Sequence, residues 1–130
     1  MTPRDVVLAF WDAMQSNDFE RASTWLSTDF EGHWPQSGEL TQGRQAFARI
    51  NTEYPAEDRW EFQLNGIVCE GTHVVTDVSV TDGTTTGRAI TFHTVEDGLI
   101  ARQTEFWPDP FAPPAWRADW VSVVDAPPFG

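Results

Sequence analysis

The sequence contains no lysine, a single cysteine and no long run of apolar residues, and each of these absences excludes a class of protein. Eight arginines stand against 20 acidic residues, and the resulting net charge of −12 repels phosphate backbones and anionic membranes. Cys69 has no partner for a disulfide within the chain, which is typical of an intracellular protein. No apolar run approaches the length of about 18 residues that a membrane helix needs, and the N-terminus lacks the pattern of a signal peptide. We therefore predict a cytoplasmic protein that binds neither nucleic acid nor a membrane.

Local signals predict three helices in the first half of the chain. Thr2 and Asp5 have the spacing of a capping box, which predicts a helix to about residue 16. Asn17 with an acid three residues later predicts a short second helix, and a third is expected over residues 41–54, where a proline follows. Four segments of alternating polar and apolar residues then predict an antiparallel meander from position 59 onward. Helices followed by hairpins indicate an α+β domain whose helices cover one face of a curved sheet.

Four prolines between residues 108 and 114 interrupt the alternating pattern that precedes them. Because proline removes a backbone donor, the last strand is expected to stop near Trp107. The segment beyond it contains Phe111, Trp116 and Trp120, which are too apolar to favour water. We therefore expect this segment to fold back over an opening and to form the wall of a pocket.

Several stretches of the chain resemble the SnoaL-like branch of the nuclear-transport-factor-2-like (NTF2-like) superfamily. They are DVVLAFWDAMQSNDFERASTWLSTDFEGHWP, the helix opening GRQAFARI, and the turn and strand DGLIARQTEFW with the following DPF. The resemblance covers residues 1–123 as one domain and leaves residues 124–130 as a flexible tail. It implies a cone-shaped α+β fold, in which a strongly curved antiparallel sheet wraps around three N-terminal helices and a pocket lies in the open end. It also implies a homodimer through the convex sheet face.

The alternation of side chains along each strand predicts which residues of the implied fold line the pocket. If the short turns keep register, Asp77 shares a sheet face with His93, Gln103 and Glu105, because side chains alternate along a strand. Composition alone would bury the opposite face, which is rich in valine. The resemblance implies instead that Trp107 points into the cone, which places the polar set inside and the apolar set on a convex face buried in a dimer. The expected convex set is Val74, Val78, Val80, Ile90, Phe92, Ile100 and Phe106.

The predicted pocket residues point to proton-transfer chemistry. We expect His93 to move the proton, with Glu105 or Asp77 orienting it and Gln103 fixing a substrate oxygen. Burial in an apolar cone would shift the pKa values of these groups. The alternative is that they only satisfy one another, or face water because the register is shifted. The expected ligand-binding residues are Trp11, Trp34, Trp60, Thr91, Gln103 and Trp107, a set that favours a flat, hydrophobic ligand.

The resemblance does not extend to the proton-handling residues of the ketosteroid isomerases of this superfamily. Phe10 and Trp34 stand where those enzymes carry an oxyanion-hole tyrosine and a general-base aspartate. Two functions are therefore open, besides a third possibility of a purely structural dimer module with a closed cone. One is a cofactor-independent enzyme of isomerase, cyclase or hydratase type, acting on a hydrophobic carbonyl or polyketide-like compound. The other is a non-catalytic protein that sequesters a small apolar ligand. No cofactor or metal is predicted, since the three histidines lack the close spacings of zinc sites.

Overall fold

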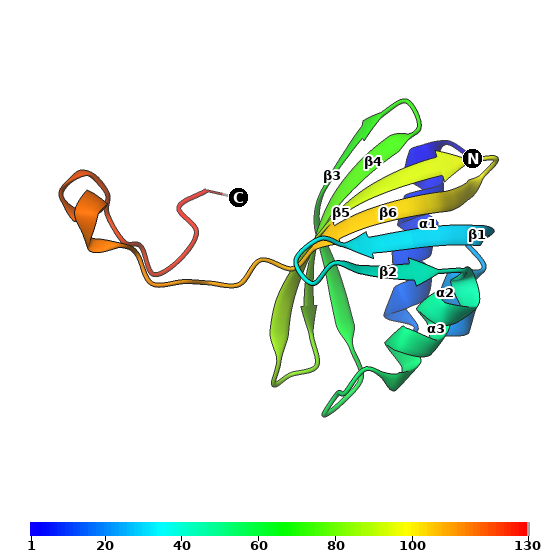
Figure 1. The fold of residues 1–130 in the computed structure, drawn as a ribbon, viewed down its shortest axis with the longest axis horizontal. Coiled ribbons are helices and arrows are strands. Elements are labelled where there is room, and N and C mark those ends of the chain that lie inside the picture. The colour runs from blue at the N-terminus through cyan, green and yellow to red at the C-terminus, as the bar shows by residue number, and fades with distance from the viewer. Residues whose placement is uncertain (130) are drawn as a thin grey trace.

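A strongly curved sheet wraps around the helices in the computed structural model, which describes residues 1–129 (Figure 1). Within these residues six strands form the sheet in the order β2-β1-β6-β5-β4-β3, and all neighbours are antiparallel except β1 and β6, which run parallel. The helices cover one face and leave the convex face open (Figure 1). The predicted α+β fold is thereby confirmed. The elements are α1 (Pro3–Gln15), α2 (Phe19–Ser23), β1 (Leu26–Trp34), β2 (Glu39–Gln42), α3 (Arg44–Glu53), β3 (Glu61–Glu70), β4 (His73–Thr81), β5 (Thr86–Glu96) and β6 (Leu99–Phe106).

Helix α1 begins at the predicted capping box. The Thr2 hydroxyl accepts the Asp5 N–H at 3.2 Å, and the Asp5 carboxylate accepts the Thr2 N–H at 3.0 Å. Two backbone donors at the helix start are satisfied in this way. With 13 residues α1 is the longest helix described, and no helix of residues 1–129 is long and apolar enough to cross a membrane. The residues that α1 buries are Val6, Val7, Phe10, Trp11, Ala13 and Met14.

Two helix starts differ from those predicted. Asp18, rather than Asn17, caps α2 by accepting a backbone N–H three residues later at 3.0 Å. Asn17 has a positive φ of 61°, and its side chain bonds both the backbone N–H and the backbone C=O of Trp60 at 2.8 Å. Helix α3 begins at Arg44, later than expected, because residues 39–42 form β2 and satisfy their backbone groups against β1.

The β4–β5 hairpin has a different parity from the one expected. Thr81 pairs with Thr86 across a four-residue loop, and Val74 therefore pairs with His93. Since directly paired residues point to the same face, the even-numbered residues of β4 share the concave face with the odd-numbered residues of β5. The prediction that Val74, Val78 and Val80 lie on the convex face is wrong, because they are buried against the helices. A register shift between β5 and β6 likewise brings Ile100 into the core.

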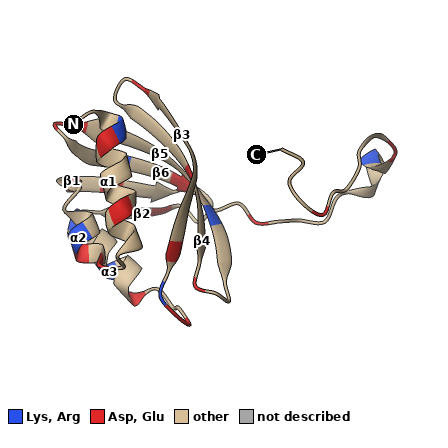
Figure 2. Cartoon of the chain, turned by 180° about the vertical axis from the view of Figure 1, so that it is seen from behind, with Lys and Arg blue, Asp and Glu red and all other residues tan. Residues whose placement is uncertain are grey.

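The chain beyond β6 leaves the domain. Strand β6 ends at Phe106, directly before the proline-rich segment, as the sequence predicts. Residues 108–129 then run away from both the sheet and the helices, as Figures 1 and 2 show from opposite sides. The expectation that this segment folds back over an opening is therefore wrong. The backbone N–H of Trp107 donates to Gln36 Oε1 at 2.5 Å, which fixes the direction in which the segment departs.

Candidate functional site

A carboxyl group with three hydrogen-bond donors lies on the concave face near the end of β6. Glu105 pairs with Thr91 of β5, whose hydroxyl donates to Glu105 Oε2 at 2.7 Å. The indole N–H groups of Trp34 and Trp107 both donate to Oε1, at 3.1 and 2.9 Å. Trp34 reaches this position because β1 runs parallel to β6. The structure thus brings together four residues that the sequence predicted for the pocket.

Burial raises the pKa of Glu105 above its ordinary value of 4.5. The physical cause is the loss of hydration around the charged form once the carboxyl is enclosed. The three donors stabilise the carboxylate and lower its pKa, but they do not cancel the effect of burial. Glu105 is therefore suited to exchange a proton closer to neutral pH than an exposed glutamate does.

Trp107 is held over the site by contacts on several sides. Its backbone N–H is bonded to Gln36 and its indole N–H to Glu105. Its ring lies over Gly87 of β5, where an added Cβ would come within 3.2 Å of a ring carbon. Gly87 therefore leaves the space that the indole fills.

His93 lies deeper on the same face and is only 1% exposed. Its Nε2 lies 2.8 Å from Thr76 Oγ1, and its Nδ1 lies 3.0 Å from Gln103 Nε2. The indole N–H of Trp11 donates to the same threonine oxygen at 3.1 Å. With the Gln103 amide donating to Nδ1, a neutral imidazole carries its proton on Nε2 and donates it to Thr76. Both ring nitrogens are thus paired within the protein.

Burial lowers the pKa of His93 to about 3, so the imidazole is neutral at physiological pH. Its two hydrogen-bond partners are Thr76 and Gln103, which corrects the expectation that Glu105 or Asp77 orients it. A neutral imidazole with both nitrogens occupied has no free position for a substrate. His93 therefore has the properties of a buried structural residue.

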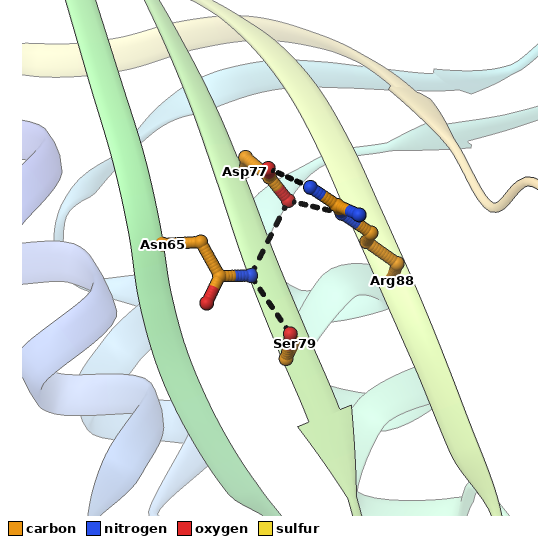
Figure 3. Close-up of polar contacts among 4 residues, drawn as sticks. All are labelled: Asn65, Asp77, Ser79 and Arg88. Atoms are coloured by element: carbon orange, nitrogen blue, oxygen red, sulfur yellow. Dashed lines mark hydrogen bonds and ion pairs between the residues drawn. The ribbon is translucent and has the colours of Figure 1, made fainter. Parts of the chain in front are cut away.

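Asp77 lies on the convex face, so its predicted place beside His93 is wrong (Figure 3). Its carboxylate accepts hydrogen bonds from Nε and Nη2 of Arg88, the first at 2.7 Å, and one from the Asn65 amide at 3.4 Å. The Arg88 guanidinium lowers the pKa of Asp77, which keeps the carboxylate ionised. Asp77 lies on the convex face because the pairing of the β4–β5 hairpin turns the odd-numbered residues of β4 outward. Asp77 is thus a partner in a surface ion pair, remote from Glu105.

Two of the predicted ligand-binding tryptophans lie away from Glu105. Trp11 is buried in the core, and Trp60 packs just before β3, edge-on to Tyr54 at a ring distance of 5.8 Å. A recess of about 430 Å³ lies along the ends of β3, β4 and β5, and another of about 230 Å³ lies between α1 and β3. Neither recess is lined by Glu105, whose carboxyl is hydrogen-bonded to both indoles. The two indole N–H groups occupy Oε1 of this carboxyl, so a ligand that bonds to Oε1 competes with them.

Sequence reasoning missed two residues that shape the site. Thr76 was not predicted, although the number of residues in the β4–β5 loop would have placed it beside His93. Gly87 was not predicted either, although a glycine inside a strand often marks a close approach by another group. In residues 1–129 no three His, Cys, Asp or Glu side chains gather as the ligands of a metal ion would.

Comparison with known families agrees with the fold and identifies the class of protein. The model of the SnoaL-like domain matches residues 7–103, which is most of the chain, and the protein belongs to this family. The resemblance seen in the sequence is thereby confirmed. Glu105 lies just beyond the matched residues. No curated protein matches the sequence.

Solved structures with the same fold carry the names of several activities. A predicted ketosteroid isomerase from Kribbella flavida DSM 17836 has a TM-score of 0.87 and 29% identity, and the match covers 95% of this chain and 90% of that one. A predicted SnoaL-like polyketide cyclase from Jannaschia sp. CCS1 has a TM-score of 0.68 at 16% identity, over 81% and 84% of the two chains. An LEH-like epoxide hydrolase from M. tuberculosis has a TM-score of 0.65 at 19% identity, over 80% of each chain. The last two show the NTF2-like fold alone, so the reaction has to be argued from the site.

Proposed function

We propose that this chain is a cofactor-independent enzyme that uses Glu105 as its general acid or base on a hydrophobic carbonyl or polyketide-like compound. The observation that carries the proposal is a carboxyl of raised pKa enclosed by two indoles and one hydroxyl. Membership of the SnoaL-like family supports a small-molecule reaction. So do the isomerase, cyclase and hydrolase names of proteins with this fold.

Glu105 can occupy both of the states that proton transfer needs. Its ionised form would take a proton from the carbon next to a substrate carbonyl, leaving an enolate, and its protonated form would return the proton at another position. The three donors favour the ionised form and burial favours the neutral form, so neither state is out of reach. An indole N–H that a substrate displaces from Glu105 becomes a donor for the oxygen on which the negative charge develops.

The groups around Glu105 define the class of substrate. The indoles of Trp34 and Trp107 present flat apolar surfaces with one donor each, which suits an aromatic or fused-ring ketone. His93 and Gln103 stay bonded to each other deeper in the domain, and we assign them a structural role.

The proposal is tested by exchange of the α-protons of apolar ketones with D2O, followed by NMR, because this readout does not require the product to be known. We expect the protein to accelerate exchange for part of a panel of aromatic and polyketide-type ketones. Glu105→Gln should reduce that acceleration at least about 100-fold, the lower end of what general base catalysis contributes. Glu96→Gln changes an exposed acid at the end of β5 and should leave the rate unchanged. Equal exchange in Glu105→Gln and the native chain would contradict the assignment.

One observation favours a non-catalytic binding protein as the second candidate. The recess of about 430 Å³ lies within the volume range of small-molecule pockets and does not include Glu105. In that case apolar compounds would raise the melting temperature in proportion to occupancy. They would do so equally in Glu105→Gln, and no proton exchange would accompany binding.

A further inference from the structure

Residues 108–129, here the C-terminal arm, expose large apolar side chains that have no partner in their own domain. Phe111 is 79% exposed and Trp120 is 77% exposed. Figures 1 and 2 show the arm leaving the domain on the side away from the helices. Among the described residues, no hydrogen bond or ion pair joins the arm to the rest of the chain. Exposed aromatic groups in such number mark a surface that is buried in an assembly. The exposed large apolar residues of the arm are Phe111, Trp116, Trp120, Val121, Val123, Val124 and Phe129.

The arm has a defined shape before it meets a partner. Four prolines restrict its first seven residues, and a 3₁₀ helix, Ala115–Trp120, follows. Within that helix the Arg117 guanidinium lies 5.7 Å from the centre of the Trp116 ring. Trp107 fixes where the arm begins, through its bonds to Gln36 and Glu105. A pre-organised segment loses little conformational entropy on docking, which favours binding.

One of the structural matches includes part of the arm. The match with the Kribbella flavida structure covers 95% of the chain, which is more than residues 1–107 could supply alone. The aligned residues therefore extend into the arm.

The convex face of the sheet supplies an apolar surface of the kind the arm requires. Val68 is 69% exposed and Phe92 is 48% exposed, and the Phe92 ring packs edge-on to Phe106 at a centroid distance of 6.1 Å. The helices cover only the other face of the sheet (Figure 1). We call the apolar residues that neighbour one another on this face the convex patch: Val68, Val75, Ile90, Phe92 and Phe106.

The charges of the two surfaces are complementary. The arm carries three aspartates and one arginine. Exposed Arg102 lies beside the convex patch, paired in the ladder with Thr94, and has no ion pair among the described residues. In a chain of net charge −12 with only eight cationic side chains, an exposed arginine is a specific place for an acidic segment to dock.

We propose that the C-terminal arm of one copy packs across the convex patch of a second copy, and that the second arm does the same in return. The occupant of the convex patch is thus another molecule of this chain, and the assembly is a homodimer with exchanged arms. Phe111, Trp116 and Trp120 would be the anchors. Three aromatic side chains bury about 150–250 Å² each, so two arms supply on the order of 1,000 Å² from the anchors alone, as a stable interface requires.

The first test measures the mass of the full chain by sedimentation velocity over a concentration series. We expect a dimer, and we expect Trp116→Ser with Trp120→Ser to shift it to the monomer at concentrations where the native chain is dimeric. Since these residues lie outside the folded domain, circular dichroism should be unchanged. Leu40→Ser removes an exposed apolar side chain of β2 and is the matched control, which should remain a dimer. A native chain that is monomeric throughout, or a double variant that stays dimeric, would overturn the proposal.

The second test asks whether the arm reaches another chain. In a Cys69→Ser background, chains carrying Ser122→Cys in the arm are mixed with chains carrying Thr104→Cys, next to Phe92 on the convex face. Oxidation should give a disulfide-linked heterodimer, whereas Leu40→Cys in place of Thr104→Cys should give none. A chain that carries both Ser122→Cys and Thr104→Cys tests whether the arm packs on its own domain instead. If it forms an intrachain disulfide at high dilution while the mixed sample forms none, the arm folds onto its own domain and the proposal is wrong.

Discussion

Glu105 and His93 lie on neighbouring strands of one sheet face, yet burial shifts their pKa values in opposite directions. The cause is common to both, since an enclosed site disfavours whichever form carries the charge. For the carboxyl the charged form is the deprotonated one, and for the imidazole it is the protonated one. The site therefore combines a histidine that is neutral at physiological pH with a glutamate whose pKa is raised. This difference is the reason we assign the proton transfer to Glu105.

The depressed pKa of His93 predicts a loss of stability in acid. In the unfolded chain the imidazole takes a proton as the pH falls below 6.5, while in the folded chain it does so only near pH 3. Between these values each pH unit should remove about 1.4 kcal/mol from the free energy of unfolding. Urea unfolding at a series of pH values measures the slope. His93→Gln should flatten it, and His33→Gln, at an exposed position, should leave it unchanged. Equal slopes in all three proteins would show that His93 is not buried as the structure indicates.

The raised pKa of Glu105 predicts a pH dependence of stability opposite to that of His93. A folded-state pKa above the unfolded value of 4.5 contributes stability below 4.5 that is lost as the pH rises through the folded-state pKa. Glu105→Gln has no carboxyl to ionise and does not lose this stability. The free energy of unfolding of the variant, relative to that of the native chain, should therefore increase as the pH rises from 4.5 through the folded-state pKa. Trp34 and Trp107 donate directly to this carboxyl, so tryptophan fluorescence should report the same titration above pH 4.5. A fluorescence titration that persists in Glu105→Gln would assign the effect to another group.

At the scale of elements, one loop decides which side chains reach the site. The Asp82 carboxylate accepts backbone N–H groups of Thr84 and Thr85, at 2.9 and 2.6 Å, and that of Glu57 at 2.9 Å. These bonds stabilise the four-residue loop between Thr81 and Thr86. With that loop length Thr76 faces inward and Asp77 outward. Alternation within β4 predicts two sets of side chains but does not say which set is buried.

The close approach of β5 to Trp107 leads to a test of the site's packing. Gly87→Ala places a Cβ about 3.2 Å from an indole whose hydrogen bonds leave it little freedom to move. We expect a loss of about 1–3 kcal/mol in the free energy of unfolding, as for other overpacked positions. Gly66→Ala is the control, since no atom lies within 4 Å of its added Cβ, and its stability should change little. If both variants unfold alike in urea, the Trp107 ring is not held against Gly87.

At the scale of the whole molecule, Trp107 links the two proposals. It donates to Glu105 in the site, and it is also the last residue before the C-terminal arm. A dimer with exchanged arms would hold the backbone on the C-terminal side of Trp107 and so limit the motion of the indole that covers the carboxyl. The proposed enzyme and the proposed dimer nevertheless depend on different residues. Loss of the arm's tryptophans leaves Glu105 and its three donors unchanged.

The sequence by itself determined the local features of this protein. The capping box of α1, the alternating strands and the prolines after β6 act through residues close together in the chain, so their pattern is sufficient. It also determined membership of the SnoaL-like family and the presence of Glu105, Thr91 and two tryptophans in one site. Tertiary structure alone decided which face of β4 is buried, that His93 is bonded to Thr76, and that the arm leaves its domain. These depend on the length of a loop and on contacts between distant strands, because a shift of one residue reverses every side chain of a strand.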